Sequence, residues 1–270
     1  MIAIVDTGVD PHHPDLAAKL TPGATFGRGT TSTSDDLGHG TAVAGIAAAA
    51  TNNHLGIAGV CPLGRIMPIK VVDSAGVDTF AAKAKGIRWA VDHGARVINV
   101  SLANPTDSSR VRASVAYDYD HGVVVVAGTG NAGVDTPMYP AAYPHVLAVG
   151  GSDNRDRRWP RSNYGPKDLV LAPSVGIFTT VSHGNLNSYG EFTGTSMAAP
   201  QVAGLAALLL SFHPELTVDQ IISAVERGAD PVEGQTAYNR EDGWGRIDCY
   251  RSLRVVQAMA VSKPARRLFR

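Results

Sequence analysis

The sequence predicts an α/β fold, a three-layer arrangement in which a mostly parallel, twisted sheet carries helices on both faces. Short runs rich in β-branched residues alternate with longer helical segments almost throughout the chain, which is the pattern of a parallel sheet with crossover helices. The runs are continuously apolar, as expected for strands that are buried on both faces. With 270 residues, 44% hydrophobic and 18% charged, the chain suits one large domain with a sizeable core.

The first strand is predicted at Ile2–Val5, where four apolar residues lead into Asp6 and a glycine turn. In parallel sheets the functional site lies beyond the carboxyl ends of the strands, so the residues that directly follow strands are the first candidates for function. Further strands are predicted, in order, at Ile66–Val72, Val97–Ser101, Val123–Ala127 and Val146–Gly150.

Helices are predicted between these strands from their composition and their end signals. Gly94 and Gly122 close two of them, because glycine readily adopts the left-handed conformation that ends helices. Thr217 is predicted to cap a later one. The predicted helices are Gly40–Ala50, Thr79–His93, Ser109–His121, a long helix that begins near Ser196 and contains the apolar run Val202–Leu210, and Thr217–Arg227.

The charge is balanced, with 24 Lys and Arg residues against 24 Asp and Glu, so composition gives no reason to expect nucleic acid or a membrane surface as a partner. No uninterrupted apolar run reaches the roughly 18 residues of a membrane span. The basic segment 263–270 is expected to be a solvated end. Cys61 and Cys249 are interpreted as a reduced pair, with a single disulfide as the alternative.

A serine stands in front of the most apolar helix, within the small-residue sequence Gly194–Pro200. Unpaired backbone N–H groups and the positive end of the helix dipole favour negative charge there, and small neighbours let a substrate carbonyl approach. A nucleophile for acyl transfer needs these conditions. An ordinary N-cap role explains Ser196 equally well, because serine is favoured at that position.

Two further segments supply the groups that activate a serine. Asp6 ends the first strand, and His39 lies between Gly38 and Gly40 at the start of an Ala-rich helix. The flanking glycines leave the imidazole open to approach. Taken singly, Asp6 is also typical of a turn, and His39 of the surface at a helix start. Together with Ser196 they supply a carboxylate, an imidazole and a hydroxyl in the order Asp, His, Ser.

Three motifs carry a resemblance to a known family. The chain resembles the subtilisin-like serine proteases, or subtilases, in which these motifs occur in the same order. The resemblance extends over nearly the whole chain and implies a single subtilisin-like peptidase domain over residues 1–270. The motifs are Ile4–Gly8, Gly38–Thr41 and Gly194–Pro200.

The resemblance implies a serine endopeptidase that hydrolyses peptide bonds through an acyl-enzyme on Ser196, with no cofactor required for the chemistry. His39 would act as general base and then general acid, and Asp6 would hold the imidazole in the productive tautomer. Asn131, which lies between glycines after a predicted strand, would donate to the oxyanion together with the Ser196 backbone N–H. From the residues alone, Asn131 is equally typical of a left-handed turn.

The resemblance also implies a protein or peptide substrate in an extended conformation, bound by backbone pairing. Ser101, Leu102 and Ala103 resemble the family strand that pairs with substrate, although a plain core strand explains their composition as well. Gly130 and Met138 are expected at the first specificity pocket. Ala103 stands where the family mostly has glycine, and Met138 would reduce the pocket floor. We therefore expect a preference for P1 side chains of medium size and apolar character.

Members of the family often bind calcium between the segment after the catalytic aspartate and the loop after the histidine helix. The matching positions here are Asp15 and Asn53, with the backbone carbonyls near Leu55 and Ile57. Oxygen ligands in a turn suit a structural Ca²⁺. In the alternative interpretation, Asp15 caps a helix from Leu16 and Asn53 is an ordinary turn residue.

Family members usually carry a signal, a pro-segment that assists folding and further residues before the strand that ends in the catalytic aspartate. None of these is visible here, so the chain is interpreted as a trimmed catalytic core lacking the N-terminal segment, with a natural short form and an incomplete gene model as alternatives. The resemblance implies a secreted, monomeric protein with its own pro-segment as a folding partner. Two other functions are weighed. One is a catalytically silent subtilase fold that serves as a binding module. The other is a peptide ligase or cyclase whose acyl-enzyme is captured by an amine.

Overall fold

The computed structural model describes residues 1–182 and 188–261, so the basic segment 263–270 lies outside the described residues. A seven-stranded sheet forms the centre, in the order β2-β3-β1-β4-β5-β6-β7, and all of its neighbouring strands are parallel. Its strands are β1 (Ile2–Asp6), β2 (Ala24–Thr25), β3 (Ile66–Lys70), β4 (Val97–Val100), β5 (Val124–Gly128), β6 (Val146–Ser152) and β7 (Leu169–Pro173).

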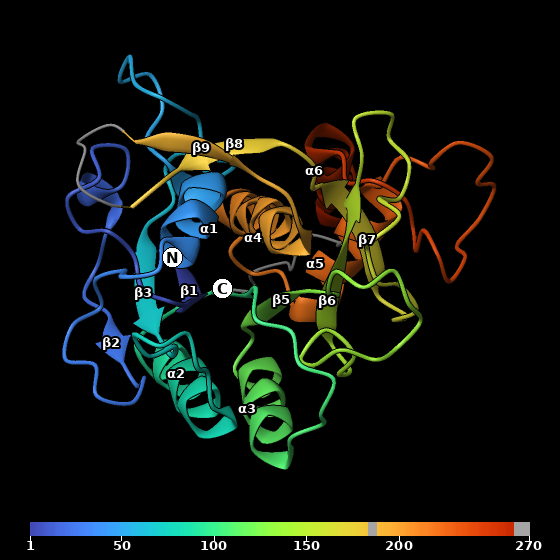
Figure 1. The fold of residues 1–270 in the computed structure, drawn as a ribbon. Helices are drawn as coiled ribbons and strands as arrows, with labels where there is room; N and C mark the ends of the chain where they lie inside the picture. Colours follow the sequence, from blue (N-terminus) through green and yellow to red (C-terminus); the bar gives the residue numbers. More distant parts are fainter. Residues whose placement is uncertain (183–187, 262–270) are drawn as a thin grey trace, which may run out of the picture.

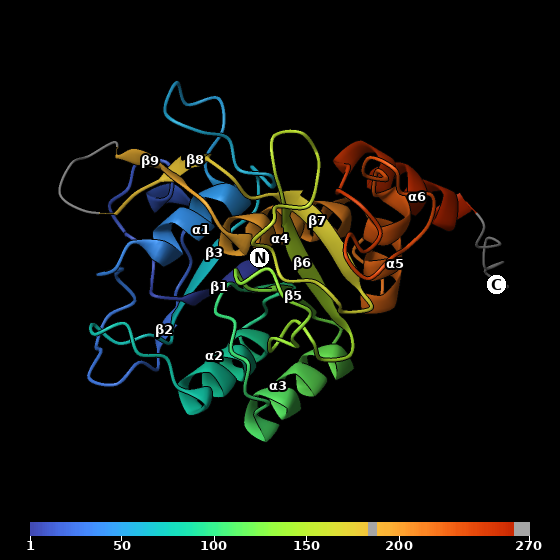
Figure 2. The same ribbon diagram turned by 45° about the vertical axis from the view of Figure 1, so that its right-hand side comes forward.

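Helices cover both faces of this sheet, which confirms the predicted three-layer α/β architecture (Figures 1 and 2). Successive side chains of a strand point to opposite faces. Ile2 and Ile4 therefore enter the core on one side of the sheet, whereas Ala3 and Val5 enter the core on the other. The first core includes α1 (His39–Ala48), α4 (Thr195–Phe212), α5 (Val218–Gly228) and α6 (Cys249–Val261), and the second includes α2 (Phe80–Asp92) and α3 (Ser109–Asp120).

Most predicted elements are present, with ends shifted by about one or two residues. Thr79 caps α2 by accepting a backbone hydrogen bond, and Thr217 caps α5 in a capping box with Gln220. The interpretation in which Asp15 caps a helix is wrong. A short 3₁₀ helix spans Ala17–Lys19 there, and it has no side-chain cap.

Several elements were not predicted from the sequence. They are β2, β7, α6 and an antiparallel hairpin of β8 (Ile177–Thr180) and β9 (Tyr189–Phe192). The hairpin lies over α1 (Figure 1). Its hydroxyl groups hold it there, because Thr179 donates to the backbone carbonyl of Ala42 and Thr180 to that of Thr41. These bonds fix the side of α1 that faces away from the sheet.

Helix α4 is 18 residues long and apolar enough, by length and composition alone, to cross a membrane. The sequence reading did not anticipate this. In the fold, 67% of the helix is buried inside the protein, and it packs between the sheet, α1 and α5. Its apolar surface is therefore explained by its position in the core.

The two cysteines are free thiols, Cys61 buried and Cys249 half-buried. The disulfide alternative is therefore wrong. Burial raises the pKa of both thiols, which keeps them protonated and unreactive at neutral pH.

Helix α3 buries a carboxyl group without a partner. Asp118 is fully buried, and among the described residues neither of its carboxylate oxygens has a hydrogen-bond partner. Burial raises the pKa of Asp118 to about 8, while Arg88 opposes this effect and Asp92 adds to it. The folded protein thus holds this proton more tightly than the unfolded chain does. The free energy of unfolding should therefore fall as the pH rises from about 4 to about 8.

We expect Asp118→Asn to raise the free energy of unfolding at pH 9 by roughly 2–5 kcal/mol, because one pKa unit corresponds to about 1.4 kcal/mol, and to change it little at pH 4. Thermal melts at the two pH values would measure this. Asp120→Asn, an exposed carboxylate on the same helix, is the matched control. An equal gain for Asp118→Asn at both pH values would contradict a buried, protonated carboxyl.

Candidate active site

The candidate residues lie at the carboxyl-terminal edge of the sheet. Asp6 is the last residue of β1, and Asn131 follows β5. His39 is the first residue of α1 and Ser196 the second of α4, and these two helices pack against each other on one face of the sheet (Figures 1 and 2). The topology therefore brings a strand end, a loop and two helix starts to the same edge.

Asp6 and His39 form a direct pair. Nδ1 of His39 lies 2.7 Å from Oδ1 of Asp6, whose side chain is 0% exposed against 32% for the imidazole. The same oxygen accepts the Thr7 N–H at 2.8 Å. Because an ionised carboxylate only accepts hydrogen bonds, Nδ1 carries its proton, and Nε2 is left for proton transfer.

The pKa of His39 is raised above its usual value. Burial alone would lower the pKa of this imidazole. The negative charge of Asp6 and its hydrogen bond outweigh that effect, and the charge of Asp35 adds to it. The imidazolium form of His39 is therefore stabilised by two carboxylates rather than one.

Ser196 is not the N-cap of its helix. Gly194 occupies that position, and no side chain caps α4, so the N-cap interpretation of Ser196 is wrong. The Ser196 hydroxyl donates instead to the backbone carbonyl of Ser101, with Oγ and O 3.2 Å apart. Among the described residues, no hydrogen bond joins this hydroxyl to the imidazole of His39.

Pro200 accounts for a second link between Ser196 and Ser101. Proline has no N–H, so Pro200 inside α4 leaves the Ser196 carbonyl, four residues earlier, without its helical donor. The Ser101 hydroxyl donates to that carbonyl at 3.1 Å and itself accepts from Asn99 Nδ2 at 2.9 Å. The end of β4 is thus tied to the first turn of α4, a contact that the sequence reading did not foresee.

The side-chain amide of Asn131 has a fixed orientation. Its Oδ1 accepts the backbone N–H of Thr195 at 2.9 Å and the Thr195 hydroxyl at 3.0 Å, which leaves the NH₂ group as the donor end. A Cβ on Gly194 would lie 3.3 Å from Nδ2, so glycine there keeps the space beside the amide open. The positive φ angles of this loop belong to Gly130 and Gly133, so the left-handed turn interpretation of Asn131 is wrong.

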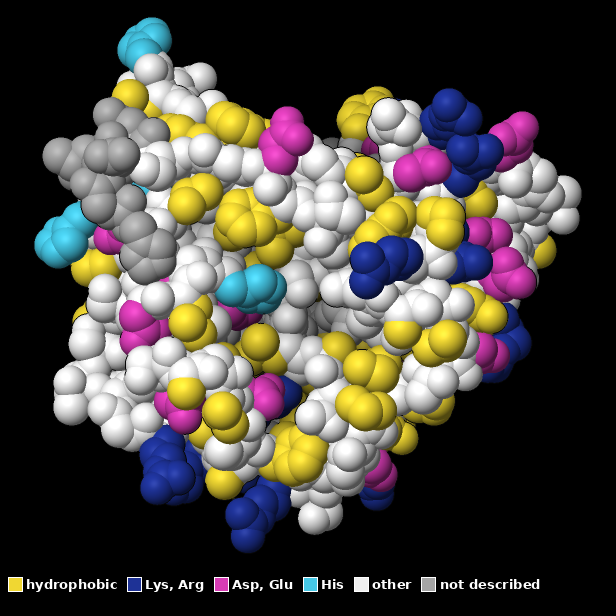
Figure 3. Space-filling view, in the orientation of Figure 1, with side chains coloured by type: hydrophobic (Ala, Val, Ile, Leu, Met, Phe, Trp, Pro, Cys, Tyr) yellow, Lys and Arg dark blue, Asp and Glu magenta, His cyan; other side chains and the backbone are white. Residues whose placement is uncertain are grey.

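The predicted substrate-binding residues lie on two loop segments that backbone hydrogen bonds bring together. Ser101, Leu102 and Ala103 follow β4, and Asn104 then exchanges two backbone hydrogen bonds with Tyr139, at 3.0 and 2.8 Å. This exchange brings the segment beside the loop that contains Met138, whose Cγ would lie 3.4 Å from a Cβ on Gly130. The face in Figure 3 is hollowed near its centre, and hydrophobic and uncharged side chains border much of the hollow.

The predicted calcium residues form a hydrogen-bonded cluster. Asp15 is fully buried, and its carboxylate accepts from Asn53 Nδ2 at 2.6 Å, the Ile57 N–H at 3.3 Å and the Tyr189 hydroxyl at 2.8 Å. Asn53 Oδ1 is engaged by the Leu55 N–H at 3.3 Å. Ca²⁺ takes six to eight oxygen ligands, whereas these groups direct N–H and O–H donors at the carboxylate. In this arrangement the side chains of Asp15 and Asn53 are engaged with each other and with neighbouring donors.

Comparison with known proteins agrees with the fold. Residues 1–245 match the Peptidase S8 group, described as the subtilase family. Thermitase of Thermoactinomyces vulgaris is 41% identical over 252 residues, which cover 93% of this chain and 88% of thermitase. Subtilisin DY of Bacillus licheniformis is 42% identical over 224 residues, which cover 82% of this chain and 80% of that protein.

Solved structures give the same result. Fervidolysin from Fervidobacterium pennivorans, described as a keratinolytic enzyme related to subtilisin, superimposes with a TM-score of 0.85 at 33% identity, over 94% of this chain and 42% of that one. A protease from Pseudoalteromonas arctica has a TM-score of 0.86 at 28% identity, over 94% and 89% of the two chains. Fold and relatives together define a serine endopeptidase that needs no cofactor for its chemistry. Within that class, the chain belongs to the subtilase family.

Proposed function

We propose that this endopeptidase hydrolyses peptide bonds through an acyl-enzyme on Ser196, with Asp6, His39 and Asn131 as its partners. The observation that carries the proposal is the 2.7 Å contact between Asp6 and His39, at the sheet edge where the first turn of α4 contains Ser196. A buried carboxylate bonded to Nδ1 leaves Nε2 of the imidazole as the general base for a hydroxyl at that edge.

In this mechanism His39 takes the proton of Ser196 as the hydroxyl attacks the substrate carbonyl, and then gives it to the leaving amine. The NH₂ group of Asn131 and the backbone N–H of Ser196 donate to the oxyanion. The first N–H groups of a helix have no partner within the helix, which supports the role of the Ser196 N–H. Water then releases the acyl group.

The test is labelling with a fluorophosphonate, which reacts with activated serines. We expect peptide mass spectrometry to find the label on Ser196, and Ser196→Ala to abolish both labelling and casein digestion. Ser211→Ala, an exposed serine on the same helix, is the matched control and should retain both. Labelling elsewhere, or digestion by Ser196→Ala, would overturn the proposal.

The same experiment separates the two other functions. A silent binding module would take up no label, although it could still bind peptide. A ligase or cyclase would be labelled, but in the presence of an added amine its products would carry the mass of the joined peptide rather than that of the hydrolysed one.

Replacing Asn131 tests the oxyanion contact. We expect Asn131→Ala to lower kcat by about 10²–10³-fold with little change in KM, because the lost donor acts mainly on the transition state. Asn131 also accepts from Thr195, so alanine removes an anchor of α4 as well. Asn131→Asp keeps an acceptor for Thr195 but loses the NH₂ group. If Asn131→Asp kept wild-type kcat, the oxyanion role would be wrong.

The substrate is proposed to be a protein or peptide segment in extended conformation that pairs with Ser101, Leu102 and Ala103. Met138 lies close enough to Gly130 that a Cβ added there would meet its Cγ at 3.4 Å, and this closeness supports a P1 pocket of limited depth. A peptide-library digest should show medium apolar residues at P1, and a preference for Arg or Lys would refute this assignment.

Calcium is tested by adding a chelator to the casein digest and to a thermal melt. The hydrogen bonds around Asp15 favour a protein whose rate and melting temperature are unchanged by the chelator. A lower melting temperature that Asp15→Asn abolishes would instead support calcium at this position. Family resemblance supports secretion, a monomeric enzyme and a pro-segment as folding partner.

A further inference from the structure

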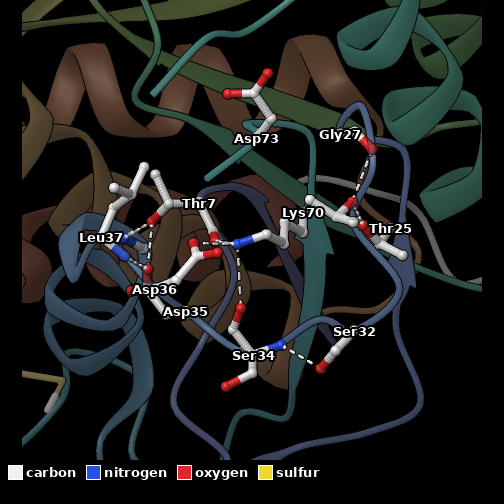
Figure 4. Close-up of polar contacts among 12 residues, drawn as sticks. Thr7, Thr25, Gly27, Ser32, Ser34, Asp35, Asp36, Leu37, Lys70 and Asp73 are labelled. Carbon is white, nitrogen blue, oxygen red and sulfur yellow. Dashed lines mark hydrogen bonds and ion pairs between the residues drawn. The ribbon is translucent and has the colours of Figure 1, made fainter. Parts of the chain in front are cut away.

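A buried carboxylate organises the loop that leads into α1. Asp35 is 7% exposed and accepts hydrogen bonds on both oxygens. Its Oδ1 accepts from the Thr7 hydroxyl at 2.8 Å, the Gly38 N–H at 2.8 Å and the Leu37 N–H at 3.1 Å. Its Oδ2 accepts from the N–H and the hydroxyl of Thr41, at 2.8 and 2.6 Å. Figure 4 shows Asp35 beside Thr7 and Leu37.

These donors stand on both sides of the catalytic pair. Thr7 directly follows Asp6, whereas the other donors come from residues on either side of His39. The Thr7 hydroxyl also accepts the Gly40 N–H at 2.8 Å. A Cβ on Gly40 would lie 2.1 Å from the carbonyl oxygen of Gly8, so the chain after β1 and the first turn of α1 are in direct contact.

A buried lysine holds the other side of the loop. Lys70 on β3 is 1% exposed, and its Nζ donates to the carbonyls of Thr7 and Ser34, at 2.7 and 3.2 Å, and to the carboxylate of Asp36 at 2.5 Å (Figure 4). The two adjacent aspartates thus have different partners. Asp36, whose side chain is 47% exposed, pairs with Lys70, while Asp35 is turned toward α1.

We propose that Asp35 is a positioning residue for the reaction. Its carboxylate ties the residue after Asp6 to the backbone on both sides of His39, and so sets the distance and angle at which the imidazole meets its partners. Asp35 touches neither substrate nor the reacting hydroxyl, so it acts through His39. This inference rests on the proposed function, because it assumes that His39 is the general base.

The pH dependence of activity distinguishes a positioning role from a purely structural one. The charge of Asp35 should affect it, whereas a purely structural residue would not. The charged groups around His39 are Asp6 on β1 and Asp35 in the loop, with Lys70 on β3 and Asp36 paired to each other beside them. The negative charge of Asp35 helps to raise the pKa of His39. Removing that charge should lower the pKa, and thereby extend activity to lower pH.

The test is Asp35→Asn, with rates expressed per active site as counted by fluorophosphonate titration. We expect kcat to fall by about 10- to 100-fold with KM little changed, since small misplacements of a catalytic group cost this much. The fall of kcat/KM at low pH, which we call the acid limb, should move to lower pH. Asp120→Asn, the same substitution at an exposed carboxylate on α3, is the control and should leave the acid limb in place.

A second pair of variants covers the case in which Asp35→Asn does not fold. Thr7→Val removes the bridging hydroxyl without changing charge, so it should lower kcat but keep the wild-type acid limb. Thr7→Ser keeps the hydroxyl, so it should have nearly wild-type kcat. A folded Asp35→Asn with wild-type kcat and acid limb would overturn the inference, as would a wild-type kcat for Thr7→Val. Absence of label on Ser196 in the wild type would instead mean that the proposed function itself has failed.

Discussion

Replacing His39 with alanine should reduce kcat by about 10⁶-fold while leaving KM nearly unchanged. The general base and the nucleophile act as a unit, so losing either removes almost all of the rate acceleration. The residual acceleration comes from substrate binding and the oxyanion donors. The pH profile should change as well. The wild type should lose activity as His39 becomes protonated, whereas the residual rate of His39→Ala should rise steadily with hydroxide concentration.

His121→Ala is the matched control, since His121 is an exposed histidine at the end of α3. It should have wild-type kcat and the wild-type acid limb. Binding of a peptide inhibitor to His39→Ala should keep its affinity, which would show that substrate binding is intact. If His39→Ala retained even a hundredth of the wild-type kcat, the imidazole would not be the general base.

The sequence predicted the centre of the fold because local pattern and tertiary position agree there. A run such as Val123–Ala127 has the β-branched composition of a strand buried on both faces, and β5 occupies that position in the middle of the sheet. The site was predictable for the same reason. Asp6 ends a strand and His39 and Ser196 begin helices, so the parallel topology alone carries them to one edge.

The parts that the sequence did not predict depend on tertiary contacts. The strands β8 and β9 are half-buried and mixed in composition, and they are held by hydroxyl groups that bond to α1. Asp35 looks like any acidic loop residue in a polar segment, and only the fold brings donors from the residue after β1 and from α1 to its carboxylate. The hydrogen bond from the Ser101 hydroxyl could not be predicted for the same reason. Its acceptor is a carbonyl that Pro200 leaves without a helical donor.

Asp6→Asn should lower kcat by about 10⁴-fold, which is less than the loss for His39→Ala. The imidazole would still be present, but the amide cannot stabilise the imidazolium by charge, and it can donate to Nδ1 and so select the wrong tautomer. Removing the charge of Asp6 should also lower the pKa of His39, because Asp6 is the main group that raises it. The acid limb should therefore move to lower pH, in the same direction as for Asp35→Asn but with a far larger loss of rate.

The stability of the same variant separates catalysis from folding. Asp6 is fully buried, and among the described residues its Oδ2 has no hydrogen-bond partner. A buried charge with an unpaired oxygen costs free energy, so the neutral Asp6→Asn should have a melting temperature no lower than that of the wild type, measured in the Ser196→Ala background. A protein that loses almost all activity while keeping its stability would identify Asp6 as a group that serves the reaction. A large drop in melting temperature would instead identify Asp6 as a structural residue. Its contact with His39 would then serve folding rather than catalysis.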